Sequence, residues 1–313
     1  MSNSNLLTIQ SMLSNTSKDI IKGKTFVGID FGTSTTVVSI ASYDALNDKI
    51  NVEPIRLQQI LSNGAQYQSE KLPSVIAWYN KRILVGEGAS ELKYTLKKGK
   101  NIWYSFKMEI GEDLGAKYFE SEVANVEPLK ISNPKDCVRV LFMYLKMLIT
   151  RYCESRGLSL NISYAISIPA SFEANQRKEL MEALGKNDMI VSRQSLIDEP
   201  NAAFISYVND CQNSEKPLTI SPHYNPKVLV FDFGGGTCDI SILEIGKSAK
   251  GLYSKNLSIS KFTKLGGDDI DRYITYKYLL PRFLEHNNTT IDEFRTPEIK
   301  YIASQLYKVA ERL

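Results

Sequence analysis

The feature that most constrains the fold of this chain is a motif that occurs twice, 202 residues apart. The segment DFGTSTTVVSI at 30–40 matches DFGGGTCDISI at 232–242, with Asp, Phe, Gly, Thr, Ser and Ile in register. In each copy a β-rich run enters the Gly/Thr turn (26–29; 228–231) and another leaves it (37–40; 240–245). The distance exceeds any solenoid period, so it predicts two similar lobes that each open with a hairpin. The alternative is two unrelated glycine turns.

The residue types in these turns predict a phosphate-binding site. Glycine at 32 and at 234–236 permits positive φ angles and close backbone approach, so successive N–H groups can surround an anion. Asp30 and Asp232, at the strand ends, would supply the negative charge that a phosphate-bound Mg²⁺ needs, through its water ligands. Hydroxyl groups add further donors, from Thr33, Ser34, Thr35 and Thr237. Two facing turns of this kind predict a clamp for one Mg-nucleotide.

Length and composition exclude several classes of protein. A chain of 313 residues is long enough for about two domains, and 38 basic against 35 acidic residues leave a net charge of only +3. That balance does not predict a nucleic-acid partner. The most apolar long segment, 138–152, is interrupted by Arg139, Lys146 and Arg151, so no membrane span is expected. The four scattered cysteines and the absence of a secretory signal pattern favour reduced thiols in the cytoplasm.

The organisation of the chain follows from the position of the two copies. We expect an N-terminal extension at 1–23, a first lobe at 24–211 with an inserted subdomain at about 61–130, a linker at 212–226 and a partial second lobe at 227–313. A long helix should begin near Asn133-Pro134 and run to about Ser155. After it we expect alternating strands and helices, in the order strand 161–170, helix 173–184, strand 189–197 and helix 200–210.

Five segments together resemble the seventy-kilodalton heat-shock chaperones, members of the actin, hexokinase and heat-shock ATPase superfamily. They are GIDFGTSTTVV at 28–38, IPASFEANQR at 168–177, LIDEPNAAFISY at 196–207, VFDFGGGTCDISILEI at 230–245 and LGGDDIDRYI at 265–274. The resemblance covers about residues 24 to 313. It implies an α/β actin-like ATPase fold, with ribonuclease H-like duplicated lobes of β-sheet and helix, the second lobe incomplete and a nucleotide-capping subdomain starting near 265.

The resemblance also implies roles for individual residues. Asp30 and Asp232 match the carboxylates that hold the Mg²⁺ water shell, and Glu199 matches an acidic residue near the attacking water and the Mg²⁺. Lys107 lies where the family places a catalytic lysine that orients this water, which would stabilise charge on the γ-phosphate. Its alternative is a solvated surface lysine, and for Glu199 a first-turn helix acid is a compatible role. The phosphate cradle matches Gly32, Thr33, Ser34, Thr35, Gly234, Gly235, Gly236 and Thr237, of which Thr237 is also assigned to catalysis.

Further matches lie outside the two turns. Gly266, Gly267 and Asp268 resemble a turn that contacts the nucleotide, and Glu311 belongs to a helix that grips the adenosine. Pro169 and Arg177 match positions that relay the nucleotide state toward a substrate-binding domain. A generic turn, a strand-ending proline and a surface arginine are the respective alternatives.

Several departures indicate a divergent member. Thr35 and Thr36 replace residues with fewer hydroxyls, Asp198 stands where the family usually has Asn, and Cys238 stands where an aromatic residue is usual. Apolar residues keep helical spacing from Ile299 up to the last residue, without a glycine cap, so we expect the capping subdomain to be cut short.

The resemblance implies binding and slow hydrolysis of Mg-ATP, with ATP or ADP and Mg²⁺ as ligands, as the nucleotide-binding domain of a chaperone. In a full-length parent, the partners would be unfolded peptide clients, a J-domain-type cochaperone and a nucleotide exchange factor. Two alternatives stay open from the residues. One is a small-molecule, sugar-type kinase of the same superfamily, and the other is a non-hydrolysing scaffold or filament protein switched by nucleotide.

Overall fold

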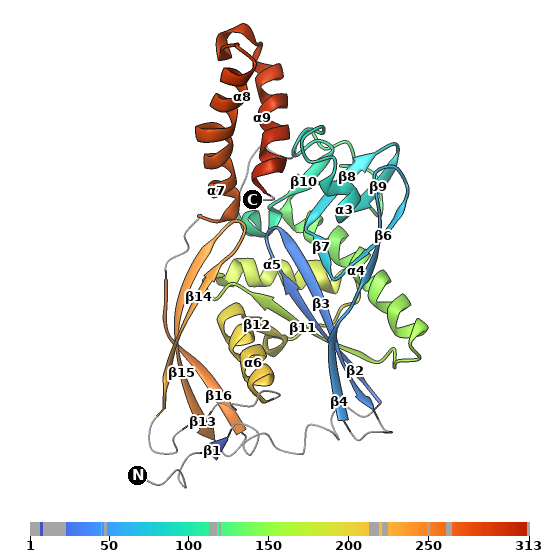
Figure 1. The fold of residues 1–313 in the computed structure, drawn as a ribbon. Helices are drawn as coiled ribbons and strands as arrows, with labels where there is room; N and C mark the ends of the chain where they lie inside the picture. The colour runs from blue at the N-terminus through green and yellow to red at the C-terminus, as the bar shows by residue number, and fades with distance from the viewer. Residues whose placement is uncertain are drawn as a thin grey trace.

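The computed structural model describes residues 7–8, 23–44, 46, 49–112, 118, 120–212, 219–220, 225–248, 251–260 and 265–311. Two β-sheets stand side by side with a helix between them, and a helical arm rises above them (Figure 1). In the described part of the chain no helix has the length and apolar character needed to cross a membrane. The division into an extension, two lobes and a linker stays a prediction.

The first sheet has the strand order β12-β11-β2-β3-β4, with β7 also paired to β3. Its central hairpin consists of β2 (Thr25–Phe31) and β3 (Thr35–Asp44), and β4 (Lys49–Pro54) extends it at one edge. On the other side, β11 (Ile162–Ile168) runs parallel to β2 and β12 (Leu196–Asp198) parallel to β11. Alternate residues of β2 are buried, which is the period-2 pattern of a sheet with one covered face.

The second sheet repeats the hairpin of the first. It has the order β14-β15-β16, from Lys227–Phe233, Cys238–Ser248 and Gly251–Ile259. Asp30 pairs with Val37 in the first hairpin, and Asp232 pairs with Asp239 in the second, at the same offset of 202 residues. The whole ladder keeps this offset, from Val27 opposite Ile40 to Leu229 opposite Ile242. The predicted duplication of strand, turn and strand is therefore confirmed.

The region predicted as an insertion at 61–130, together with the strand β5 just before it, forms small sheets above the edge of the first sheet. One is the hairpin β5 (Leu57–Ile60) and β6 (Gln66–Ser69), and another has the order β10-β8-β9, from Ile102–Tyr104, Val75–Tyr79 and Arg82–Val85. The strand β7 (Lys71–Pro73), the short helix α3 (Glu87–Ser90) and the 3₁₀ turn η2 (Phe106–Glu109) complete it. The turn η2 carries Lys107 and brings it beside the first sheet.

The helix α4 (Pro134–Ser155) covers one face of the first sheet and confirms the expected bounds. Asn133 caps it by accepting a hydrogen bond from the Asp136 N–H (2.9 Å), with Pro134 at the first helical position. The Phe142 ring packs edge-on against Phe31 of β2, with centroids 5.2 Å apart. The helix α5 (Ala174–Gly185) packs against α4, and together they bury the main hydrophobic core.

The strand expected at 189–197 is wrong over most of its length. A 3₁₀ turn, η4 (Arg193–Ser195), occupies its middle, and only the three residues of β12 pair with β11. The hydroxyl groups of Ser192 and Ser195 hydrogen-bond locally and hold this turn, which competes with the ladder. The helix α6 (Glu199–Gln212) follows directly and lies between the two sheets (Figure 1).

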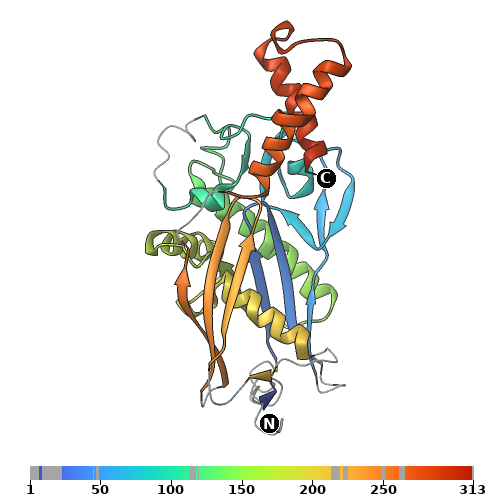
Figure 2. The ribbon, with the colours of Figure 1, turned by 60° about the vertical axis from the view of Figure 1, so that its left-hand side comes forward.

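The helical arm follows the second sheet in the chain. It contains α7 (Gly267–Ile274), the π-helical segment η5 (Thr275–Leu279), α8 (Leu280–His286), the 3₁₀ turn η6 (Ile291–Glu293) and α9 (Thr296–Ala310). The α9 helix runs back along the arm, so that its C-terminal end returns to the base near α7 (Figures 1 and 2), where the Tyr307 hydroxyl donates to the Asp268 carbonyl (3.0 Å). Near the N-terminus, β1 (Leu7–Thr8) pairs with β13 (Thr219–Ile220) at the opposite end of the molecule.

Candidate functional site

The first turn, residues 32–35, is closed by a hydrogen bond from the Gly32 N–H to the Thr35 carbonyl (3.1 Å). Ser74 holds the turn with two hydrogen bonds: its hydroxyl donates to the Gly32 carbonyl (2.8 Å), and its N–H donates to the Ser34 carbonyl (2.9 Å). A Cβ atom at Gly32 would lie 2.2 Å from the Thr35 carbonyl oxygen. Glycine is therefore required for the tightness of this turn.

The second turn, residues 234–237, repeats this geometry. The Gly234 N–H donates to the Thr237 carbonyl at 2.8 Å, which is the same bond 202 residues later. Within the described residues, no hydrogen bond uses the main-chain N–H groups of Thr33, Ser34, Gly235 or Gly236. These four groups are thus free to donate to an anion between the turns.

The two turns meet face to face. A Cβ atom at Gly235 would lie 2.1 Å from the Ser34 Oγ atom, and one at Gly236 would lie 2.9 Å from the Thr33 Cγ2 atom. Gly32 and Gly234–Gly236 all lack positive φ angles, so that part of the expectation is wrong. Glycine at these positions therefore allows the two turns to approach each other closely, since a side chain at Gly235 would push the turns apart.

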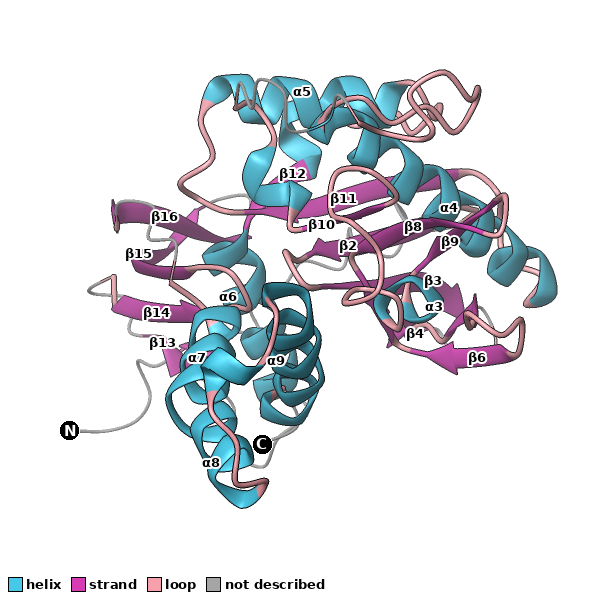
Figure 3. Cartoon of the chain, turned by 90° about the horizontal axis from the view of Figure 1, so that it is seen from above, coloured by secondary structure: helices cyan, strands magenta, loops and turns pink. Residues whose placement is uncertain are grey.

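The start of α7 joins the second turn, as predicted for the segment at 266–268. The Gly267 N–H donates to the Gly234 carbonyl (3.0 Å) and the Asp268 N–H to the Gly235 carbonyl (2.8 Å). A Cβ atom at Gly266 would lie 2.5 Å from the main chain of Gly235. Seen from above, α7 and α9 stand beside the ends of the two sheets (Figure 3).

A buried ion pair lies beside the turns. The Lys107 Nζ atom is 2.5 Å from the Glu199 Oε1 atom and 5.6 Å from the centroid of the Phe31 ring. Lys107 is 3% exposed, which excludes the alternative of a solvated surface lysine. Glu199 is the first residue of α6, which agrees with the expected first-turn position and does not exclude another role.

Two further carboxylates, Asp30 and Asp232, approach this pair. Burial raises the pKa of Glu199; Lys107 opposes that shift, and Asp232 and Asp30 add to it. Burial likewise raises the pKa of Asp232, again opposed by Lys107 and increased by Asp30. The Ser167 hydroxyl donates to Asp30 Oδ1 (2.6 Å) and holds this side chain in place. The structure therefore brings together the four charged residues that the resemblance singled out.

Asp239 is a buried carboxylate of the same cluster that sequence reasoning missed. It pairs with Asp232 across the second hairpin, and burial raises its pKa, as does the charge of Asp232. The Thr237 hydroxyl hydrogen-bonds to it and lowers this pKa in part. A signal was available in the repeat, because Asp239 stands where the first copy has Val37.

A cavity of about 160 Å³ opens between the first turn and the arm. Glu311 lies at its rim, where its Oε1 atom is 3.5 Å from Lys93 Nζ and accepts a hydrogen bond from the Tyr94 hydroxyl (3.3 Å). Its lining includes Thr33, Ser34, Thr35, Tyr104, Asp268 and Glu311. Residues of the first turn, of α7 and of the end of α9 thus share one cavity.

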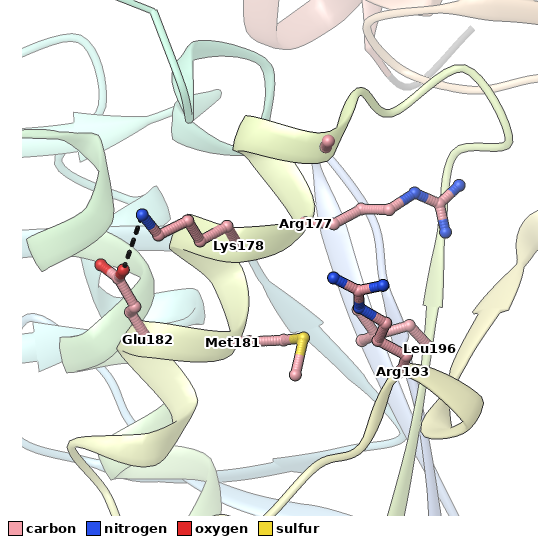
Figure 4. Close-up of a pocket in the computed structure, with 7 residues that line it drawn as sticks. Arg177, Lys178, Met181, Glu182, Arg193 and Leu196 are labelled. Atoms are coloured by element: carbon pink, nitrogen blue, oxygen red, sulfur yellow. Dashed lines mark ion pairs between the residues drawn. The ribbon is translucent and has the colours of Figure 1, made fainter.

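Pro169 and Arg177 are joined through Phe172, and Pro169 stands between Ser167, which contacts Asp30, and Ser171, which contacts Asp239. The Phe172 N–H donates to the Pro169 carbonyl (3.0 Å), and Arg177 Nε donates to the Phe172 carbonyl (3.0 Å). The Arg177 guanidinium also contacts Asp198 (2.8 Å), so it is not a free surface arginine. A cavity of about 590 Å³ lies beside it, between α5 and β12 (Figure 4). Because this larger cavity contains none of the turn residues, its volume does not mark the phosphate site.

The donor set fits a hydrated Mg²⁺. Carboxylate oxygens of Asp30, Asp232, Asp239 and Glu199 are the ligand type that Mg²⁺ prefers. Among the described residues, no three such side chains are grouped closely enough to hold a metal ion directly. Mg²⁺ usually keeps several water ligands, and contacts through such waters would suit these carboxylates.

Comparisons with known proteins agree with this geometry. The sequence model described as "Hsp70 protein" matches residues 26–312, which is most of the chain. The chain belongs to the Hsp70 family. The α/β actin-like ATPase fold expected from the resemblance is thereby confirmed, and the Hsp70 match spans both hairpins, α6 and the arm.

Two relatives illustrate the extent of the Hsp70 likeness. The chain is 30% identical over 278 residues to "Chaperone protein dnaK" of Phaeodactylum tricornutum, covering 84% of this chain and 39% of that protein. It is 31% identical over 261 residues to "Chaperone protein DnaK" of Mycoplasma mobile, covering 83% of this chain and 36% of that protein. The chain thus spans less than two fifths of the length of these relatives. The roles of individual site residues stay predictions.

Proposed function

We propose that this chain binds Mg-ATP between its two glycine turns and hydrolyses it slowly, as the nucleotide-binding part of an Hsp70-type chaperone. The observation that carries the proposal is the meeting of two equivalent turns, with Gly235 against Ser34, beside the buried Lys107–Glu199 pair. Family membership and the relatives named as chaperones support it. The sugar-type kinase and the non-hydrolysing scaffold are not favoured by these relatives.

In this mechanism the phosphates lie between the turns. The free N–H groups of Thr33, Ser34, Gly235 and Gly236 donate to phosphate oxygens, and the turn hydroxyls add donors. Asp30 and Asp232, with Glu199 and Asp239 nearby, would hold Mg²⁺ through its water ligands. When bound, the ion neutralises the charge of the phosphates and polarises them.

The Lys107–Glu199 pair would orient the attacking water and stabilise the charge that develops on the γ-phosphate. Its burial strengthens such electrostatic interactions, because little water screens them. Glu199 is held in this position by the start of α6 and by Lys107. Closure of the arm, with Asp268 and Glu311 at the cavity, would hold the adenosine side of the nucleotide.

The whole protein's partners belong to the same proposal. Nucleotide state would control binding of unfolded peptide clients, with a J-domain-type cochaperone and a nucleotide exchange factor, through movement of the lobes. Pro169 and Arg177 would relay that state. A cytoplasmic location is supported by the free thiols of Cys137, Cys153 and Cys238.

Calorimetry with ATP and Mg²⁺ tests the binding step. We expect saturable binding by the wild-type chain, and its loss in the Asp30→Asn, Asp232→Asn double variant. Phosphate release should then fall by at least about 100-fold in Lys107→Ala while binding persists. A folded wild-type chain that binds no nucleotide would refute the proposal. Binding without any Lys107-dependent hydrolysis would favour the scaffold alternative.

A further inference from the structure

The turn that carries Lys107 is short and does not hold itself in place. The four residues of η2 are all buried, and the chain enters it through Ser105, whose φ angle is 60°. This is a left-handed conformation that residues other than glycine rarely adopt. A single 3₁₀ turn is also not stable alone. The position of Lys107 therefore depends on contacts that hold η2 from outside.

Glu109, the last residue of η2, makes such contacts. Its Oε2 atom accepts a hydrogen bond from the Tyr118 hydroxyl (2.7 Å), and its Oε1 atom lies 3.5 Å from Lys98 Nζ. Glu109 is 7% exposed and Tyr118 is 4% exposed, so little water competes for the carboxylate. A charge-assisted hydrogen bond in such surroundings is strong, and it holds the end of η2.

The Tyr118 hydroxyl keeps the proton that this hydrogen bond needs. Burial raises the pKa of Tyr118, and Cys137 and Glu109 add to the shift. A protonated phenol donates to a carboxylate, whereas a phenolate cannot. The contact between Tyr118 and Glu109 is therefore present at neutral pH.

Lys98 holds the chain on the other side of Lys107. Its Nζ atom lies 4.3 Å from the centroid of the Tyr104 ring, and Tyr104 lines the cavity between the first turn and the arm. Tyr104 is the last residue of β10 and precedes Ser105 directly. Lys98 thus contacts the chain before Lys107, at Tyr104, and after it, at Glu109.

We propose that Glu109 is a positioning residue for Lys107. Its contacts with Tyr118 and Lys98 fix η2, and the fixed turn sets where the Lys107 ammonium lies. Lys107 is two residues before Glu109, and its Nζ atom is 2.5 Å from Glu199 Oε1. A shift of η2 by about 1 Å would weaken this contact and misplace the ammonium. The inference rests on the proposed function, since it adds a residue that acts on the same site without touching the nucleotide.

Tyr118→Phe removes the hydroxyl that holds Glu109 and leaves the ring in the core. We expect single-turnover hydrolysis of ATP by the full chain to slow about tenfold, while the dissociation constant for ATP stays within about twofold of the wild type. Glu109→Leu should slow hydrolysis in the same way. Glu109→Gln should keep most of the wild-type rate, because its amide oxygen can still accept the Tyr118 hydrogen bond.

Tyr152→Phe is the matched control. The Tyr152 hydroxyl also donates to a glutamate, Glu53 (3.0 Å), but this bond joins α4 to β4, so its loss should leave hydrolysis unchanged. Hydrogen exchange without nucleotide, followed by mass spectrometry, gives a measurement that needs no activity. Peptides covering η2 should exchange faster in Tyr118→Phe than in the wild type and in Tyr152→Phe.

A Lys107→Ala background separates positioning from a general loss of stability. There Tyr118→Phe should slow hydrolysis no further, because the group that is positioned is gone. Equal slowing in both backgrounds, unchanged exchange of η2, or wild-type hydrolysis in Tyr118→Phe would overturn the inference and leave the proposed function intact. A wild-type chain that binds ATP without Lys107-dependent hydrolysis would refute the proposed hydrolysis itself, and the positioning role with it.

Discussion

The Lys107 Nζ atom lies 2.5 Å from the Glu199 Oε1 atom, and Lys107 is almost fully buried. This contact joins the inserted region, through η2, to the first residue of α6. Each of these two groups, distant in sequence, therefore supplies the opposite charge beside its buried partner. Their mutual stabilisation is the basis of the first prediction.

Replacing Lys107 by Met should lower the free energy of unfolding by about 3 kcal/mol, because a buried carboxylate loses its partner. Glu199→Leu alone should also destabilise, since it leaves the Lys107 ammonium buried. The double variant should recover much of the loss, because no unpaired charge remains. Urea unfolding of the four proteins measures this cycle. Additive losses in the double variant would show that the two side chains are not coupled.

Gly235→Ala should push the turns apart, because its Cβ would lie 2.1 Å from Ser34 Oγ. We expect a loss of about 1–3 kcal/mol in stability and loss of the proposed nucleotide affinity. Ser34→Gly in the same chain should restore much of the stability by removing the clash. Gly185→Ala at the end of α5, where no atom lies within 4 Å, is the control and should be neutral or slightly stabilising. Equal effects of Gly235→Ala and Gly185→Ala in calorimetric scans would contradict the contact between the turns.

Asp232→Asn should stabilise the chain in the absence of divalent ions. Because burial raises the pKa of Asp232, the folded state binds the proton more tightly than the unfolded state. The ionised group therefore costs stability, and this cost grows as pH rises from the ordinary carboxyl range through the raised pKa. The advantage of Asp232→Asn should be largest near neutral pH and shrink on acidification.

Urea unfolding across a pH series measures this advantage, with the exposed Glu285→Gln as control. Adding Mg²⁺ should raise the stability of the wild type more than that of Asp232→Asn. A wild type that exceeds the variant in stability at neutral pH without metal would show that the sign is wrong.

Asp198 joins α5 to the second sheet. Arg177 Nη2 donates to its Oδ1 (2.8 Å), and Asn256 Nδ2 on β16 donates to its Oδ2 (2.8 Å). Asp198→Ala should cost about 2 kcal/mol, because both bonds are lost. Asp198→Asn should cost less, because a flip of the Asn256 amide turns its buried Oδ1 atom, which has no partner within the described residues, toward the new amide group as an acceptor.

The Asp198 comparison is made by urea unfolding, with Asn256→Ala as the variant that removes only the bond to Asp198 Oδ2. An Asp198→Ala variant as stable as the wild type would show that this bridge contributes nothing. The presence of Asp198, where the family usually has Asn, would then make no difference to stability through this bridge.

The turns were predictable because the repeat aligns residue by residue. Asp30 and Asp232 occupy equivalent positions near the ends of the first strands of the two hairpins. The same N–H to carbonyl hydrogen bond closes both turns. Lys107 depended on the family resemblance, because nothing in a single sequence shows that η2 folds under the first sheet. Its burial follows from long-range packing against Phe31 and not from local pattern.

Other features escaped local reasoning for physical reasons. The segment 189–197 has β-rich residues, but the hydroxyls of Ser192 and Ser195 stabilise a 3₁₀ turn instead of a longer strand. Asp239 is unremarkable in a strand until the hairpin pairs it with Asp232. Similar apolar patterns on β2 and β14 also concealed a large difference in burial, because burial depends on which helix covers each face.

Two hydrogen bonds connect α7 directly to the second turn, so the orientation of the helical arm depends on the orientation of that turn. Gly267 and Asp268 bind the carbonyls of Gly234 and Gly235, and Gly266 packs against the same main chain without room for a side chain. A small rotation of that turn would therefore move the whole arm, and the displacement would grow with distance along α7 and α8. A ligand that changed the angle of the turn would then produce its largest displacement at the far tip of the arm.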